Sequence, residues 1–155
     1  MQWAESITID RPRDQVLAAV ADEHQVMAWS AWPQATGYTC SVEGDGTSVG
    51  SEIVFRSKDG QVQGRQRLVA VGDTRVEYRL RNRGPGGREI TPSIDFTLAE
   101  MGESTRVTLH FQADAPLPTP LRQIVEAVLG RRVRALHVKD LQDLKAHVES
   151  RPVTL

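Results

Sequence analysis

Residues 119–150 have the sequence TPLRQIVEAVLGRRVRALHVKDLQDLKAHVES. Apolar side chains recur along this segment at intervals of three and four residues, which is the spacing of an amphipathic helix. Thr119 and Pro120 suit the start of a helix, and Pro152 follows its end. The spacing therefore predicts one helix over about residues 119–150, roughly 45 Å long. The apolar positions are Leu121, Ile124, Val125, Val128, Leu129, Val133, Leu136, Leu141, Leu144 and Val148.

Strands on the N-terminal side of this helix are predicted to supply the surface on which it packs. From residue 37 to residue 114, apolar and polar residues alternate in six short segments separated by glycine-containing turns. Residues 6–10 predict an earlier strand, followed by two short helices, the second over residues 24–29. We therefore predict a single α+β domain over residues 1–155. Its curved antiparallel sheet of about seven strands surrounds the long C-terminal helix.

Composition argues against several classes of protein. The 155 residues carry 19 Lys and Arg against 20 Asp and Glu, and the net charge of −1 argues against a nucleic-acid binder that depends on phosphate attraction. No apolar run approaches the roughly 20 residues of a membrane span. The first residues lack the features of a secretory signal, so we expect a cytoplasmic protein. The single cysteine, Cys40, cannot form an internal disulfide, and we expect no metal and no cofactor.

Five stretches carry a family resemblance, namely Ile7–Val16, Met27–Trp32, Val49–Ile53, Ser104–Thr108 and Lys139–Lys145. In this order they resemble the START-like SRPBCC superfamily, and within it the polyketide cyclase/dehydrase and lipid-transport family. The resemblance implies the helix-grip fold, in which a curved sheet wraps around the C-terminal helix. It also implies an internal cavity for an apolar or aromatic small molecule. It implies no single chemistry, because carriers, hormone receptors and cyclases share this fold.

Three functions are open at this point. The first is binding of a hydrophobic or aromatic molecule, lipid-like or polyketide-like, between helix and sheet. The second is an enzyme of the cyclase/dehydrase kind, in which Tyr78, Arg65 and Arg67 would hold and protonate the substrate. The third is a protein-interaction module with a vestigial cavity, which a volume well below about 300 Å³ would favour. Buried titratable groups that converge on one point would favour the enzyme. The oligomeric state, monomer or homodimer, also stays open.

Strand register predicts which polar side chains face the cavity. Lys58-Asp59-Gly60 suits a three-residue hairpin loop, which pairs the residues on either side of it. Counting in steps of two from that pair places Arg65 and Arg67 on the face that carries Phe55 and Tyr78. Two inward guanidinium groups need a carboxylate or an anionic ligand, so this register predicts an anion clamp. The alternative is that strand twist carries both arginines to the open rim, where water solvates them.

Aromatic and aliphatic side chains complete the predicted site. Trp29, Trp32 and Tyr38 are candidates to close the cavity mouth with amphipathic rings, and ordinary core packing is the alternative for all three. The four histidines are scattered, and we interpret them as surface or structural residues. Cys40 is interpreted as a buried thiol, and Gly130 as a kink or a close approach to a ligand or to the sheet. The other residues expected to line the cavity are Phe96, Leu109, Val125 and Leu129.

Overall fold

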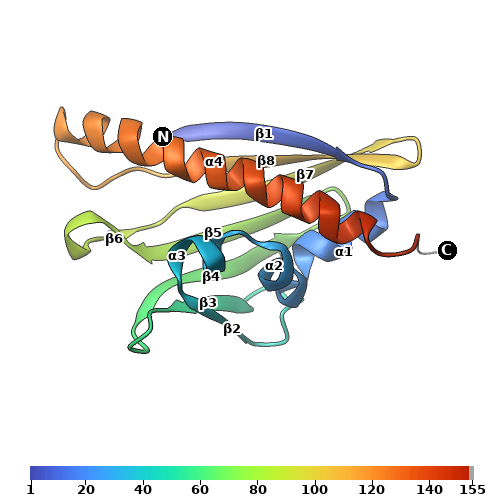
Figure 1. The fold of residues 1–155 in the computed structure, drawn as a ribbon, viewed down its shortest axis with the longest axis horizontal. Coiled ribbons are helices and arrows are strands. Elements are labelled where there is room, and N and C mark those ends of the chain that lie inside the picture. The colour runs from blue at the N-terminus through green and yellow to red at the C-terminus, as the bar shows by residue number, and fades with distance from the viewer. Residues whose placement is uncertain (154–155) are drawn as a thin grey trace.

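The computed structural model describes residues 1–153, which form one antiparallel sheet, three short helices after its first strand, and a long C-terminal helix (Figure 1). The strands are β1 (Gln2–Ile9), β2 (Thr39–Glu43), β3 (Glu52–Arg56), β4 (Val62–Val71), β5 (Arg75–Arg83), β6 (Glu89–Ile90), β7 (Ser93–Met101) and β8 (Ser104–Gln112). The helices are α1 (Arg13–Ala21), α2 (Glu23–Trp29), α3 (Trp32–Thr36), the 3-10 turn η1 (Pro85–Gly87) and α4 (Leu121–Glu149).

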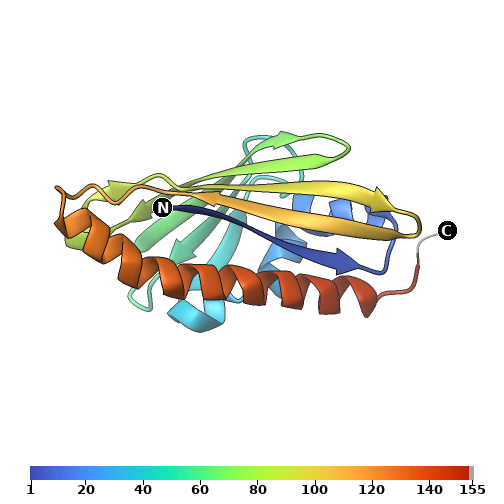
Figure 2. The same cartoon turned by 90° about the horizontal axis from the view of Figure 1, so that it is seen from above.

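The strands within residues 1–153 make a single sheet in the order β1-β8-β7-β5-β4-β3-β2, and the short β6 pairs with β5. Helix α4 lies across one face of this sheet, and α1 and α2 lie on the same face beside it (Figures 1 and 2). The arrangement confirms the predicted α+β helix-grip fold. Strand β1 starts earlier than predicted, and β6 is an additional strand. No helix within these residues is long and apolar enough to cross a membrane.

The short helices differ from the prediction in their number and at their ends. Asp22 caps α2, because its carboxylate accepts a hydrogen bond from the His24 backbone N–H at 2.9 Å. Helix α3 is absent from the prediction, because the residue before a proline avoids the helical region and Trp32-Pro33 therefore favours a helix end. Pro33 instead stands in the first turn of α3, where a missing N–H has little effect. Helix α4 starts after Pro120, without the expected side-chain cap from Thr119.

A β-bulge sets the faces of β4. The hairpin before this strand has the predicted three-residue loop, since the Ser57 N–H donates to the Gln61 carbonyl at 2.9 Å. The register then shifts, and Phe55 is paired with Gly64 rather than with Gln63. A bulge adds one residue to one strand and therefore turns every later side chain to the opposite face.

This bulge reverses the orientation predicted for Arg65 and Arg67. Both lie on the outer face of β4, where Arg65 is half-buried and Arg67 is exposed, while Gln66 and Leu68 point inward. Arg65 Nη1 contacts the exposed Glu43 carboxylate on β2 at 2.8 Å. The predicted inward pair of guanidinium groups is therefore wrong, and so is the anion clamp that depends on it.

The two halves of α4 differ in burial. Its C-terminal half packs through Leu141, Leu144 and Val148, which are at most 2% exposed. The apolar stripe predicted for the N-terminal half is only partly correct, because Ile124 and Val128 are 60% and 58% exposed. Apolar residues of that half occupy more than one side of the helix, and only one side can face the sheet. The inward side continues along the half-buried or buried residues Val125, Leu129, Val133, His137, Asp140 and Leu144.

Gly130 lies against the first strand. A Cβ atom at this position would stand 3.7 Å from Met1 Sδ and 3.8 Å from Trp3 Cζ3. Both distances are ordinary van der Waals contacts, so the backbone of α4 comes close to β1 without needing glycine for space. Of the explanations considered for this residue, close approach to the sheet is the one that these contacts match.

Candidate functional site

A pocket of about 290 Å³ lies between the inner face of the sheet and helices α2, α3 and α4. Its innermost wall includes Val26, Trp29, Phe96 and Leu109, none of which is more than 5% exposed. Its rim is formed by the end of β5, including the exposed Arg83, and by the segment after α3. Apolar groups thus dominate the wall. The remaining apolar lining residues are Met1, Trp32, Phe55, Leu80, Ile90, Pro92, Ile94, Phe111, Ala113, Leu129 and Val133.

His137 brings a polar group to this apolar wall. The side chain is 0% exposed, and its Nδ1 accepts a hydrogen bond from the Trp3 indole N–H at 3.1 Å. Its Nε2 has no hydrogen-bond partner among the described residues. The ring centroids of Phe111, Trp3 and Trp32 lie 4.7, 5.7 and 5.8 Å from that of the imidazole. Burial in these surroundings lowers the pKa of His137 to about 4, so the ring is uncharged at neutral pH.

Asp140 lies one helical turn from His137 and also lines the pocket. One of its oxygens accepts hydrogen bonds from the Ala31 N–H at 2.7 Å and the Ser30 hydroxyl at 3.4 Å, and the other from the Trp32 indole N–H at 3.1 Å. Burial raises the pKa of Asp140 to about 7, against the opposing effect of these three donors. The carboxylate therefore fastens the start of α3 to α4 and is half-ionised near neutral pH.

Most of the apolar residues predicted for the site line the pocket, but their roles differ. Trp29, Trp32 and Tyr38 all line the pocket, and the buried Trp29 also donates its indole N–H to the Ala19 carbonyl at 2.9 Å. Trp29 thus has the core role that was the alternative for it. Contact of these residues with a ligand stays a prediction. The other predicted residues that line the pocket are Phe55, Phe96, Leu109 and Leu129.

Four predicted site residues lie outside the pocket lining. Tyr78 is 0% exposed, and its hydroxyl donates to the Val20 carbonyl at 2.7 Å, so it joins the sheet to α1 inside the core. Burial raises the pKa of Tyr78, which keeps this phenol protonated. Val125 is half-buried on α4 but does not reach the pocket, and Arg65 and Arg67 point away from it.

His137 and Asp140 were missed as site residues, although the spacing of α4 contains the signal for them. Both positions continue the inward side of the helix that runs through Leu129 and Val133 and on to Leu144. A search restricted to apolar residues passes over a polar side chain on that side. His110 on β8 is exposed, in agreement with the interpretation of the histidines as surface or structural residues. His137 is buried, and its Nε2 has no hydrogen-bond partner among the described residues, so a structural role accounts for only one of its ring nitrogens.

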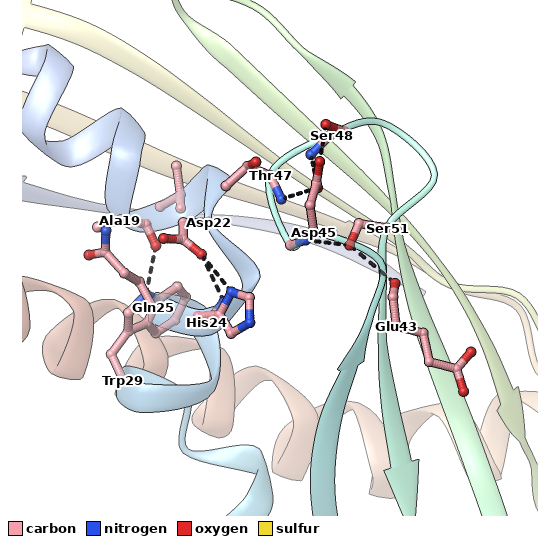
Figure 3. Close-up of polar contacts among 12 residues, drawn as sticks. Ala19, Asp22, His24, Gln25, Trp29, Glu43, Asp45, Thr47, Ser48 and Ser51 are labelled. Carbon is pink, nitrogen blue, oxygen red and sulfur yellow. Dashed lines mark hydrogen bonds and ion pairs between the residues drawn. The ribbon is translucent and has the colours of Figure 1, made fainter.

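The loop between β2 and β3 lies away from the pocket and folds around the Asp45 carboxylate (Figure 3). Asp45 accepts hydrogen bonds from the Thr47 and Ser48 N–H groups at 2.9 and 2.8 Å, and from the Ser48 hydroxyl at 2.5 Å. The bond from the Ser48 hydroxyl is the largest of the causes that lower the pKa of Asp45 to about 2. The Ser51 hydroxyl closes the loop by accepting from the Gly46 N–H at 2.8 Å.

Helix α2 buries a carboxylate beside this loop. Glu23 is 0% exposed, and its N–H donates to the Gly46 carbonyl at 2.8 Å. Neither carboxylate oxygen has a hydrogen-bond partner within the described residues. Burial raises the pKa of Glu23 to about 7, the nearby Ser51 hydroxyl offsets part of this, and the charge of Glu52 adds to it. Because Glu23 lies at the other end of α2 from Trp29 and outside the pocket lining, it concerns stability rather than the site.

Within residues 1–153, no group of three or more His, Cys, Asp or Glu side chains is arranged to hold a metal ion. Cys40 is half-buried on β2, and burial raises the pKa of its thiol. A thiol with a raised pKa is a weak nucleophile at neutral pH. The two buried titratable side chains of the pocket lining are His137 and Asp140, and the buried Gln66 is a further polar lining residue.

One comparison identifies a family, and another identifies the fold. The family model described as polyketide cyclase/dehydrase and lipid transport matches residues 2–149. No match is found among curated proteins. Protein CV1439 from Chromobacterium violaceum is 18% identical, with a TM-score of 0.68 and 96% of each chain covered. A protein from Arthrobacter aurescens is 13% identical, with a TM-score of 0.67 over 99% of this chain and 89% of that one. Protein MLL2253 from Mesorhizobium loti is 14% identical, with a TM-score of 0.65 over 99% of this chain and 100% of that one. At such identities the likeness shows the fold alone.

Proposed function

We propose that this chain, which belongs to the polyketide cyclase/dehydrase and lipid-transport family, binds a hydrophobic or aromatic small molecule in the pocket beneath α4. The observation that carries the proposal is the pocket wall, which is built largely from aromatic and aliphatic side chains of the sheet and the helices. Each Å² of apolar ligand surface that moves from water onto such a wall stabilises the complex by roughly 25 cal/mol.

The size of the pocket limits the ligand. Its volume of about 290 Å³ stands at the lower end of the range of roughly 300–1,000 Å³ found for small-molecule sites. A compact aromatic or short lipid-like molecule suits this volume better than a long-chain lipid does. The volume gives no support to the third function considered from the sequence, a protein-interaction module with a vestigial cavity.

Filling the pocket is expected to abolish most of the binding. Leu129→Trp should weaken binding of the uncharged apolar dye N-phenyl-1-naphthylamine by about ten-fold or more, because the indole occupies space that the dye needs. A fluorescence titration measures this. Val128→Trp is the matched control, since it adds the same side chain one residue earlier, at a position that is 58% exposed. Similar dye affinities for the two variants would contradict the proposal.

An enzyme of the cyclase/dehydrase kind is the second candidate, favoured by the two buried titratable side chains on the inner wall, His137 and Asp140. A carboxylate whose pKa is near 7 is suited to accept a proton at neutral pH. The sequence-based hypothesis assigned proton transfer to Tyr78, Arg65 and Arg67. We now assign it to Asp140, which lines the pocket. Proton removal next to a carbonyl, which begins carbon–carbon ring closure and dehydration, is the reaction class that this carboxylate supports.

Deuterium exchange tests the second candidate without a known substrate. In D₂O, Asp140 would remove a methyl proton of 2-acetylnaphthalene to give the enolate, and the enolate would then take up a deuteron from solvent. Proton NMR should show faster loss of the methyl signal with the wild-type protein than in buffer. Asp140→Asn should return the rate to that of buffer, while Asp143→Asn, outside the pocket lining, should keep it. Equal rates with and without the wild-type protein would rule this activity out.

A further inference from the structure

We infer that the ligand of this pocket carries an uncharged hydrogen-bond acceptor, such as a ketone or ester carbonyl, that binds the Nε2–H of His137. The inference rests on the proposed binding function and narrows its ligand class. His137 is 0% exposed, lines the pocket, and has no partner for Nε2 within residues 1–153. A buried donor without an acceptor is costly, so a ligand that supplies one gains affinity that a purely apolar ligand lacks.

The hydrogen bond from Trp3 fixes which imidazole nitrogen carries the proton. An indole N–H can only donate, so Nδ1 of His137, 3.1 Å from Trp3 Nε1, must present its lone pair. The single proton of the neutral ring is therefore on Nε2. Trp3 is itself held in place on β1, where its ring stacks on Phe111 with centroids 4.5 Å apart. The imidazole is thus oriented from its Nδ1 side, and Nε2–H is its donor without a partner within residues 1–153.

The same surroundings keep this donor uncharged. The rings of Trp3, Trp32 and Phe111 surround the imidazole and exclude water from it. Because desolvation disfavours the imidazolium ion, the pKa of His137 falls to about 4. At pH 7 the pocket therefore offers a neutral donor rather than a cation.

Charges near His137 favour an uncharged acceptor over an anion. Asp140, one turn further along α4, carries negative charge when ionised and would repel a carboxylate placed at the inner wall. Arg83 is the cationic side chain among the lining residues, and it is exposed at the rim. The N-terminal ammonium of Met1, another lining residue, is already paired with Asp114 and Glu126. An anion on the inner wall would thus lose its hydration without meeting an unpaired positive charge. A carbonyl oxygen needs only the hydrogen bond that Nε2–H provides.

Three probes of similar shape separate these chemistries, namely 2-acetylnaphthalene, 2-isopropenylnaphthalene and 2-naphthoate. For the wild-type protein at pH 7, calorimetry should show the ketone binding about ten-fold tighter than the alkene, and the carboxylate weakest of the three. In His137→Phe the ketone and the alkene should bind within about two-fold of each other. His147→Phe, on the same helix but outside the pocket lining, is the matched control and should keep the wild-type preference.

Nitrogen NMR gives a readout that does not depend on any variant folding. In the wild-type protein the ¹⁵N signals of His137 should report the Nε2–H tautomer, and the Nε2 signal should move when the ketone is added but not when the alkene is added. Equal affinity for ketone and alkene, or tighter binding of naphthoate, would overturn the inference while leaving the binding function intact. Failure of all three probes and of N-phenyl-1-naphthylamine to bind would instead overturn the proposed function itself.

Discussion

Glu23→Gln is expected to raise the free energy of unfolding at pH 8 by about 3 kcal/mol and to change it by less than about 1 kcal/mol at pH 5. The folded state raises the pKa of this carboxyl from its ordinary 4.5 to about 7, because the side chain is fully buried. Below about pH 4.5 the Glu23 carboxyl is uncharged, and its full contribution to the free energy of unfolding is present. That contribution is lost as the pH rises through about 7, where the buried carboxyl ionises. Glutamine stays uncharged, so the variant does not pay that ionisation cost at pH 8.

Urea unfolding at the two pH values measures this effect. Glu103→Gln, in the exposed turn between β7 and β8, is the control and should change the free energy of unfolding little at either pH. The pH dependence that remains in Glu23→Gln should come largely from Asp140, the other buried carboxyl with a pKa near 7. A variant that is destabilised at pH 8, or stabilised equally at both pH values, would contradict this account of Glu23.

Asp140→Ala is expected to lower the free energy of unfolding at pH 5.5 by about 2–4 kcal/mol, since it removes the acceptor of one buried and one half-buried donor. These are the Ala31 N–H and the Trp32 indole N–H, at 2.7 and 3.1 Å from the carboxylate oxygens. At pH 8 the loss should be smaller. Burial raises the pKa of Asp140 to about 7, so wild type bears the cost of an ionised buried carboxylate at pH 8 and the variant does not.

The matched control for this prediction is Asp143→Ala. Asp143 lies one turn further along α4 and makes a surface ion pair with Lys139 at 2.8 Å. Exposed ion pairs of this kind contribute about 0–1 kcal/mol. Chemical unfolding at pH 5.5 measures the free energy of unfolding of both variants. If Asp140→Ala and Asp143→Ala lower it equally, the contacts of Asp140 with α3 contribute little to stability.

Much of the fold could be predicted because its signals are local. The alternation of apolar and polar residues marks the strands, and the spacing from Leu129 to Val148 marks the long helix. The faces of β4 could not be predicted, because one bulge beside Phe55 reverses the direction of Arg65 and Arg67. The loop itself has the expected three residues, and the signal that the prediction did not use is Gly64, since a glycine inside a strand often marks a bulge.

The candidate site was predictable in its apolar part and not in its polar part. Aromatic and aliphatic residues on inward faces, such as Trp32 and Phe96, line the pocket as expected from their periodicity. His137 depends on a contact that crosses almost the whole chain, from Trp3 on the first strand to the last helix. Asp140 depends on donors from α3, a helix that the sequence did not predict. The spacing of α4 places both residues on its inward side, but the contacts that set their chemistry arise from tertiary packing and leave no periodic signal.

Intermolecular NOEs between N-phenyl-1-naphthylamine and the methyl groups of the protein test the central claim most directly, because they locate the bound molecule. The account predicts NOEs from the dye rings to pocket methyl groups, namely those of Val26, Ile94, Leu109 and Leu129. NOEs confined to Ile124 and Val128, on the exposed side of α4, would place the dye on the surface of the helix. That result, or the absence of any NOE at saturating dye, would contradict the claim that the pocket beneath α4 is a ligand site.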